Sequence, residues 1–369
     1  MRPEEIEIRQ IRMRLRHPFE TSFGVTEERH VVLLSARCGD RVGYGEVTAA
    51  EGPFFSHESY QTAWHVLSDF VIPWFLGSDL ASPSQFPKLV ASIRGHSMAK
   101  AGMENALWDL AAKVEGVPLW RMLGGRRDEI ACGVSIGIES SPEVLFRKIE
   151  DAVAEGYRRI KIKIRPGWDV RVVDRIRSRW PDLPLMADAN SAYTLEDAPR
   201  LRELDAFGLM MLEQPLHWED LIDHAALQTE LATPICLDES IHSADDARKA
   251  HQIGACRIVN VKLGRLGGHT GARAVHDCCQ ERGIPVWCGG MLETGIGRAH
   301  NVALSGLGNF SLPGDVAASR RYWDEDIVDP EIEVTPRGTI FQSEAPGIGY
   351  RVREDLVDRL TERHRRFAR

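Results

Sequence analysis

Five ionisable residues stand at almost equal intervals through the middle of the sequence: Lys163, Asp188, Glu213, Asp238 and Lys262. The steps between them are 25, 25, 25 and 24 residues, and each residue closes a short apolar run. The carboxyl ends of parallel strands meet at one mouth of a barrel. The spacing therefore predicts three carboxylates that converge on one volume, with a lysine on either side.

Three converging carboxylates repel each other unless a cation lies between them. Carboxylate oxygens are the ligands that Mg²⁺ prefers, and this ion keeps its other positions for water or a substrate oxygen. Asp188, Glu213 and Asp238 are therefore predicted ligands of Mg²⁺, with Mn²⁺ or another divalent metal as alternatives. Three unrelated helix caps are the structural alternative, which the shared position at successive strand ends disfavours.

Lys161 and Lys163 are separated by one isoleucine in an alternating segment. Side chains alternate across a strand, so both lysines face one way and the isoleucines face the other. Helices cover the outer face of a parallel barrel, and the lysines are therefore expected inside it. An edge strand with a solvated lysine face is the alternative. Two neighbouring ammonium groups are also expected to lower a pKa toward that of a useful base.

Lysines on opposite sides of a metal suit the removal of a proton α to a carboxylate. This proton is removed only if the charge that develops on the carboxylate oxygens is neutralised, which a metal does. One lysine would remove the proton, and the other would return one from the opposite face.

The elements that carry these residues alternate between strand and helix patterns from about residue 129. This alternation predicts a parallel α/β structure. The equal steps favour a (β/α) barrel over an open sheet, which would usually carry a glycine-rich phosphate loop after its first strand. Helices are predicted over residues 142–155, 170–179, 243–253 and 270–282.

The two ends of the chain predict a separate α+β cap. Residues 1–125 combine strand patterns with helices over 56–70, capped by Ser56, and over 98–114. Residues 126–312 are the predicted barrel, and residues 313–369 are predicted to return to the cap. Within that return, residues 332–334 predict a strand and residues 354–367 predict a helix.

Composition excludes several classes of protein. The 369 residues carry 46 Lys+Arg and 54 Asp+Glu, so the net charge of −8 disfavours a nucleic-acid partner. No apolar run approaches the ~20 residues of a membrane span, and the N-terminus shows no apolar signal core. Seven scattered cysteines without a CxxC pair suggest a reduced protein. We therefore expect a cytoplasmic protein without a membrane partner.

The motifs together resemble the enolase superfamily, in its muconate-lactonising-type subgroup. They are Lys161-Ile162-Lys163, Asp188-Ala189-Asn190, Glu213-Gln214-Pro215, Asp238-Glu239-Ser240 and Lys262. A finer resemblance, to the o-succinylbenzoate synthase / N-succinylamino acid (N-acylamino acid) racemase family, lies in residues 133–138, 287–301 and 309–315. It implies a modified (β/α)7β TIM-like barrel under an α+β capping domain built from both chain ends, and a homo-oligomer.

The resemblance also implies two activities on small-molecule carboxylates. One is a dehydration that forms o-succinylbenzoate in menaquinone biosynthesis, and the other is racemisation of N-succinylamino acids. Lys163 would be the base for dehydration, and Lys163 and Lys262 the two bases for racemisation. An arginine at position 265 resembles racemase-competent members, and a cation there should lower the pKa of Lys262. A solvent-facing arginine is the alternative.

Substrate-binding or supporting roles are expected for a further group of residues. Asn190 and Glu239 would orient the metal ligands or lysines, although loop capping stays open for both. The aromatic loop 17–24 and the apolar loop 53–55 would act as lids over the site. The expected contacts with substrate are Lys161, Ser135, Met291, Leu292, Glu293, Phe19 and Phe23.

Three other functions compete with this one. A dipeptide epimerase or a muconate cycloisomerase would share the metal and the lysines, but an epimerase should carry an acidic Asp-x-Asp element where Gly290-Met291-Leu292-Glu293 stands. A Schiff-base aldolase would need no cluster of three carboxylates. A binding module would hold these charges together at a cost and without a use.

Overall fold

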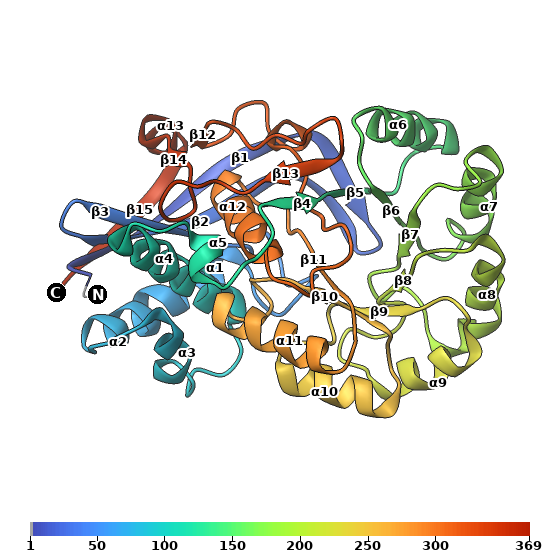
Figure 1. Ribbon diagram of the computed structural model, residues 1–369, viewed down its shortest axis with the longest axis horizontal. Coiled ribbons are helices and arrows are strands. Elements are labelled where there is room, and N and C mark those ends of the chain that lie inside the picture. Colours follow the sequence, from blue (N-terminus) through green and yellow to red (C-terminus); the bar gives the residue numbers. More distant parts are fainter. Residues whose placement is uncertain (1–2) are drawn as a thin grey trace.

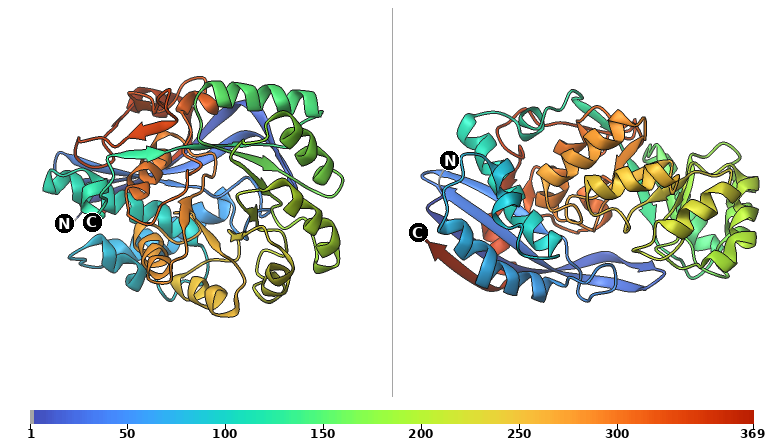
Figure 2. Two further views of the ribbon diagram at one scale, coloured as in Figure 1. Left: turned by 45° about the vertical axis from the view of Figure 1, so that its right-hand side comes forward. Right: turned by 90° about the horizontal axis from the view of Figure 1, so that it is seen from below.

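A four-stranded antiparallel sheet forms the base of the cap. The computed structural model describes residues 3–369. The strand order is β15-β1-β2-β3, with β1 at Glu5–Thr21, β2 at Gly24–Cys38, β3 at Arg41–Val47 and β15 at Thr361–Ala368. Strands from both ends of the chain therefore belong to one sheet, and they lie on the same side of the molecule in Figures 1 and 2. The predicted return of the chain to the N-terminal module is confirmed.

Helices cover one face of this sheet. Their bounds are α1 Tyr60–Val66, η1 Leu67–Val71, α2 Ile72–Leu76, η2 Pro83–Gln85, α3 Phe86–Leu89, α4 Ser97–Glu115 and α5 Leu119–Met122. Gly45 of β3 lies so close to α4 that a Cβ there would be 2.1 Å from the carbonyl oxygen of Gly102. The first helix begins later than predicted, because Ser59 rather than Ser56 accepts the backbone N–H of Thr62 as its cap.

Seven parallel strands form the barrel wall in the order β11-β10-β9-β8-β7-β6-β5. Their bounds are β5 Gly133–Ile136, β6 Arg159–Lys163, β7 Leu185–Asp188, β8 Leu212–Glu213, β9 Ile235–Leu237, β10 Ile258–Val261 and β11 Val286–Cys288. Residues 309–315 close the ring: Val286 and Asp315 pair this segment with β11, and Gly133 donates to Gly314 on the other side. The predicted (β/α)7β barrel is confirmed.

Helices surround the strands, as the right side of Figure 1 shows. They are α6 Pro142–Ala154, α7 Val170–Arg179, η3 Leu195–Asp197, α8 Ala198–Arg202, η4 Glu203–Phe207, α9 Ile222–Glu230, α10 Ala244–Ile253, α11 His269–Glu281 and α12 Gly295–Ser305. Ile160, Ile162 and Ile164 pack in the core between wall and helices, so Lys161 and Lys163 point inward as predicted.

The C-terminal segment differs from its prediction in two places. The helix predicted over 354–367 ends early, since α13 covers Glu354–Leu360 and β15 follows. Residues 361–368 form a strand because the free edge of β1 is available to them, where Arg366 also pairs with Glu7. Residues 332–334 are irregular and do not form the predicted strand. The short strands near them pair as β12 Val328–Asp329 with β14 Arg351–Val352 and as β13 Thr339–Phe341 with β4 Glu129–Ala131. The short 3-10 helix η5 covers Ser319–Arg321.

A β-ribbon from the cap reaches the barrel mouth. Residues 17–24, predicted as a loop, instead continue β1 to Thr21 and turn into β2 at Gly24. The end of this ribbon is tied to the barrel, because Ile138 N–H donates to the carbonyl oxygen of Glu20 at 2.9 Å. Ser22 Oγ also donates to the carbonyl of Asn190 at 3.1 Å. The ribbon therefore covers the side of the barrel where the predicted site lies.

Among residues 3–369, no helix combines the length and the apolar composition that crossing a bilayer requires. The domain boundaries after residues 125 and 312 stay a prediction.

Candidate active site

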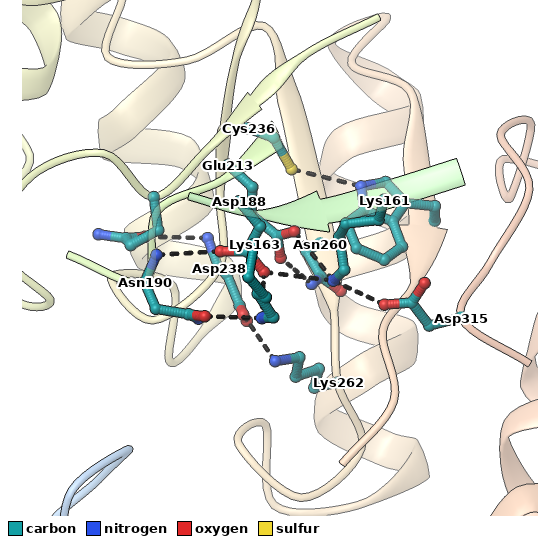
Figure 3. A network of polar contacts seen from close by, with 12 residues as sticks. Lys161, Lys163, Asp188, Asn190, Glu213, Cys236, Asp238, Asn260, Lys262 and Asp315 are labelled. Carbon is teal, nitrogen blue, oxygen red and sulfur yellow. Dashed lines mark hydrogen bonds and ion pairs between the residues drawn. The ribbon is translucent and has the colours of Figure 1, made fainter. Parts of the chain in front are cut away.

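The five evenly spaced residues meet inside the barrel mouth (Figure 3). Lys163 and Asp188 are directly paired neighbours on β6 and β7, and Asp188 and Glu213 are neighbours on β7 and β8. Asp238 and Lys262 directly follow β9 and β10. All five side chains are buried. The register of the parallel strands thus converts equal spacing in the sequence into one cluster of charges.

Lys163 contacts the first carboxylate of the cluster. Its Nζ lies 2.6 Å from Asp188 Oδ2 and 2.6 Å from Asn190 Oδ1. Asn190 in turn donates through Nδ2 to Glu239 Oε1 at 2.9 Å. Asn190 and Glu239 therefore support the side of the cluster on which Lys163 stands, as their predicted orienting role requires.

Lys262 contacts the opposite end of the cluster. Its Nζ lies 2.6 Å from Asp238 Oδ2 and 4.5 Å from the centre of the Phe55 ring. Arg265 holds the other oxygen, with its Nη2 3.0 Å from Asp238 Oδ1. It is buried rather than facing solvent. The loop carrying Phe55 thus reaches a predicted base directly.

The predicted lowering of lysine pKa values is wrong for two of the lysines. Burial alone would lower the pKa of Lys262, but the charges of Asp238, Glu239 and Glu213 raise it above its ordinary value. Burial also opposes the charge of Lys161, yet Asp315, Glu213 and Asp188 raise its pKa well above the usual range. The carboxylates outweigh the neighbouring ammonium groups because they contact the lysines directly.

Asp315 and Arg159 are part of this network, although neither was predicted as a site residue and Asp315 was noted only as the last residue of the motif at 309–315. Asp315 Oδ2 lies 2.6 Å from Lys161 Nζ, and its Oδ1 lies 2.7 Å from Arg159 Nη1. Lys161 also lies 3.1 Å from Glu213 Oε2 and 4.8 Å from the centre of the Trp287 ring. Asp315 stands on the segment that closes the barrel, outside the regular spacing, so periodicity could not find it.

The carboxyl groups of Asp188, Glu213 and Asp238 fit a divalent cation, because they offer oxygen ligands and negative charge. Burial raises the pKa of Glu213 well above its usual range, and the charges of Asp188 and Asp238 raise it further. The three carboxyl groups thus disfavour each other's negative charge in this small volume, which a bound cation would offset. Within residues 3–369 the present side-chain positions do not form a ready cage of three metal-binding groups. The ammonium groups of Lys161, Lys163 and Lys262 instead supply the positive charge that a cation would bring.

Lys161, Lys163 and Lys262 line a cavity of about 90 Å³ between the cap and the barrel. Of the predicted substrate contacts, Ser135, Met291 and Leu292 line it from the barrel side, together with Asn190. The residues that line it from the cap are Phe19, Thr21, Phe23, Thr26, Arg29, Ala50 and Phe55. The cavity is therefore closed by side chains that the cap contributes.

Glu293 is placed differently from its prediction. Its Oε1 accepts the backbone N–H of Met291 at 2.8 Å and the Nδ2 of Asn301 at 3.0 Å, and it does not line the cavity. It orders the loop that carries Met291. Glu239 and Arg265 likewise lie behind the cavity, where they border a small neighbouring space with Phe55.

Two family models match the chain. The mandelate racemase / muconate lactonizing enzyme N-terminal domain matches residues 4–124, and the enolase C-terminal domain-like model matches residues 145–356. Together they span most of the cap and the barrel.

Individual relatives agree with these matches. An o-succinylbenzoate synthase of Geobacillus kaustophilus is 53% identical over 99% of this chain and 98% of its own length. An N-succinylamino acid racemase of Thermus thermophilus is 46% identical over 98% of both chains. A solved enolase-superfamily structure from Listeria innocua superposes with a TM-score of 0.96 and 38% identity, covering 100% of this chain and 99% of the other. The chain belongs to the mandelate racemase / muconate lactonizing enzyme family and is an enzyme of the divalent-metal-dependent enolase superfamily.

Proposed function

We propose that this enzyme removes the proton α to a carboxylate and stabilises the resulting enolate. Its activities are the dehydration that forms o-succinylbenzoate and the racemisation of N-succinylamino acids. The relatives named for these two reactions support the proposal, since both cover nearly the whole chain. The two reactions begin with the same proton removal, so one site serves both.

The observation that carries the proposal is the placement of two lysines on opposite sides of one cluster. Lys163 contacts Asp188 at one end, and Lys262 contacts Asp238 at the other. Both line the same cavity. A planar enolate between them would present one face to each ammonium or amine, which is the geometry that inversion at the α-carbon requires.

Each polar group of the cavity then has a task. Bound by Asp188, Glu213 and Asp238, Mg²⁺ would supply positive charge where the enolate oxygens become negative. Lys163 removes the proton in dehydration and from one enantiomer of the racemase substrate. Lys262 removes the proton from the other enantiomer. Lys161 lies beside the carboxylate cluster, where its ammonium group can hold the substrate carboxylate. Phe19, Phe23 and Phe55 exclude water from the enolate.

The test is ¹H NMR in D₂O with N-succinyl-phenylalanine of each hand. The α-proton signal should disappear with Mg²⁺ and persist after EDTA treatment. Lys163→Ala and Lys262→Ala should each slow the exchange of the α-proton of one enantiomer by at least about 100-fold. Lys249→Ala, which removes an exposed lysine that pairs with Asp245 on α10, is the matched control. The mechanism is contradicted if α-proton exchange continues without metal, or if both variants slow the exchange of both enantiomers equally.

We also propose that the enzyme is cytoplasmic and forms a homo-oligomer. All seven cysteines are free thiols, which suits a reducing compartment. Light scattering coupled to size exclusion measures the oligomeric state directly, and a mass near 41.4 kDa would contradict the homo-oligomer.

A further inference from the structure

A buried glutamine stands beside the carboxylates at the barrel mouth. Gln214 directly follows Glu213 at the end of β8, and it is 0% exposed. Its φ of +36° lies in the left-handed region, which residues other than glycine rarely adopt. Such a backbone conformation costs free energy and persists only where the surrounding contacts fix it. The hydrogen bonds of Gln214 are therefore what holds it in this conformation.

The side chain of Gln214 continues the hydrogen bonding between β8 and β9 where the strands end. The backbone N–H of Gln214 donates to the carbonyl of Cys236 at 2.9 Å. Beyond this bond, the backbone N–H of Asp238 donates to Gln214 Oε1 at 3.0 Å. The same oxygen accepts the N–H of Ser240 at 3.3 Å. Without the glutamine, the buried N–H of Asp238 would lose its acceptor, which costs free energy.

The rest of Gln214 connects two further segments. Its Nε2 donates to Ser240 Oγ at 2.5 Å and to the carbonyl of His217 at 3.2 Å. Its backbone carbonyl accepts the N–H of Ser191 at 2.8 Å, in the loop that follows β7. One residue thus joins the loops after β7, β8 and β9. The three carboxylates of the cluster stand where these loops begin, at Asp188, Glu213 and Asp238.

The spacing of these carboxylates matters for the ion that they are expected to bind. Mg²⁺ demands nearly ideal octahedral geometry, so its affinity depends on where each ligand oxygen lies. Lys262 and Arg265 hold the carboxylate of Asp238 from the side of β10. Gln214 holds the backbone of Asp238 from the side of β8. The glutamine therefore fixes the point from which this carboxylate reaches toward Glu213.

We propose that Gln214 is a positioning residue for the metal: it sets the separation of Glu213 and Asp238 and thereby determines the affinity for the divalent cation. The inference rests on the proposed function, in which these carboxylates bind Mg²⁺. Hydrogen-bond partners that orient metal ligands typically contribute about 10- to 100-fold to metal affinity.

Binding of Mn²⁺ to the metal-free full-length protein, followed by the EPR signal of the free ion, tests this without turnover. Gln214→Leu removes the amide but keeps a side chain of similar size, and it should weaken Mn²⁺ binding by about 10- to 100-fold. Ser240→Ala keeps the glutamine and removes the hydroxyl that its Nε2 contacts. This milder variant should weaken Mn²⁺ binding by about two- to tenfold, as expected for one lost hydrogen bond.

Gln228→Leu is the matched control, because Gln228 forms similar contacts at the opposite end of β9. It is also buried, and its Oε1 accepts the backbone N–H of Ile235 at 2.7 Å. Its Nε2 donates to the carbonyls of Leu231 and Thr233. Gln228→Leu should lower the free energy of unfolding in urea about as much as Gln214→Leu does, and it should leave the affinity for Mn²⁺ unchanged.

The proposal is overturned if Gln214→Leu binds Mn²⁺ as tightly as the wild type, or if Gln228→Leu loses as much affinity as Gln214→Leu. Ser240→Ala decides the question if Gln214→Leu does not fold. Asp238→Asn separates a failure of this proposal from a failure of the proposed function. If Asp238→Asn loses Mn²⁺ binding and Gln214→Leu keeps it, only the role of Gln214 is wrong. If Asp238→Asn itself keeps the affinity of the wild type, the proposed set of metal ligands is wrong, and the role of Gln214 is wrong with it.

Discussion

Lys163 and Lys262 have the same side chain but different surroundings, and these surroundings separate their roles. Lys163 contacts Asp188 and Asn190, whereas Lys262 contacts Asp238 and the ring of Phe55. Asp238 is held on its other oxygen by Arg265. The arginine therefore acts on Lys262 through the carboxylate that they share, and not by direct repulsion as expected from the sequence.

This contact predicts an unequal effect of Arg265 on the two reactions. Arg265→Met frees one oxygen of Asp238, so Lys262 is held less firmly against its partner. Exchange of the α-proton of the enantiomer that Lys262 deprotonates should slow at least about tenfold more than dehydration does. The measurement is deuterium exchange of both hands beside a spectrophotometric dehydration assay. Arg257→Met, which changes an exposed arginine directly before β10, serves as the control. Equal losses in both assays would refute the prediction.

At the scale of elements, a glutamate of the cap joins the cap to the barrel, because its carboxyl group accepts hydrogen bonds at the N-terminus of the barrel helix α12. Glu46 on β3 accepts from Thr294 Oγ1 at 2.6 Å and from the backbone N–H of Gly297 at 2.9 Å. These donors lie at the N-terminus of α12. Burial raises the pKa of Glu46 to about 7, and the charge of Glu293 adds to this effect against the hydrogen bonds.

The raised pKa predicts that stability falls as the pH rises. Below 4.5, the ordinary value for Glu46, the folded and unfolded chains both hold the proton. Between 4.5 and about 7 the unfolded chain ionises while the folded chain keeps its proton, so the free energy of unfolding decreases. The loss is complete above the folded pKa and amounts to roughly 3 kcal/mol.

Urea unfolding between pH 5 and pH 8 measures this contribution. Glu46→Gln cannot ionise, and its unfolding free energy should therefore fall less over this range than that of the wild type. The neutral amide keeps an acceptor for the helix terminus, so the variant should fold. Parallel pH profiles for the two proteins would exclude Glu46 as the source of the effect.

At the scale of the whole molecule, the last strand completes the sheet on which the cap is built. β15 pairs with β1 from Glu5 opposite Ala368 to Ile11 opposite Thr361. Most side chains of β15 are exposed, so it contributes mainly backbone hydrogen bonds and the pairing of Arg366 with Glu7. Its second task is to cover the edge of β1, since an open edge invites pairing with another chain.

A chain that ends at Leu360 should lose both contributions. We expect a decrease of at least about 2 kcal/mol in the free energy of unfolding, from the lost backbone hydrogen bonds. The uncovered edge should also increase self-association, which sedimentation at several concentrations detects. A full-length Arg366→Ala variant removes one ion pair and leaves the strand, and it should remain close to the wild type. Truncation without either effect would show that the edge is protected in another way.

The amino-acid sequence by itself determined the barrel, the cluster of three carboxylates and the flanking lysines. Equal spacing and alternation along a strand are local properties of the sequence. The register of the parallel strands then places the equally spaced residues side by side. The tertiary structure alone decided that Arg29 and Asp315 also line the cavity. They come from segments outside the regular spacing, and they reach the cavity only because β2 of the cap packs over the barrel and residues 309–315 close its ring. The tertiary structure also decided the pKa values of the lysines and the strand at residues 361–368, because each depends on neighbours that the fold supplies.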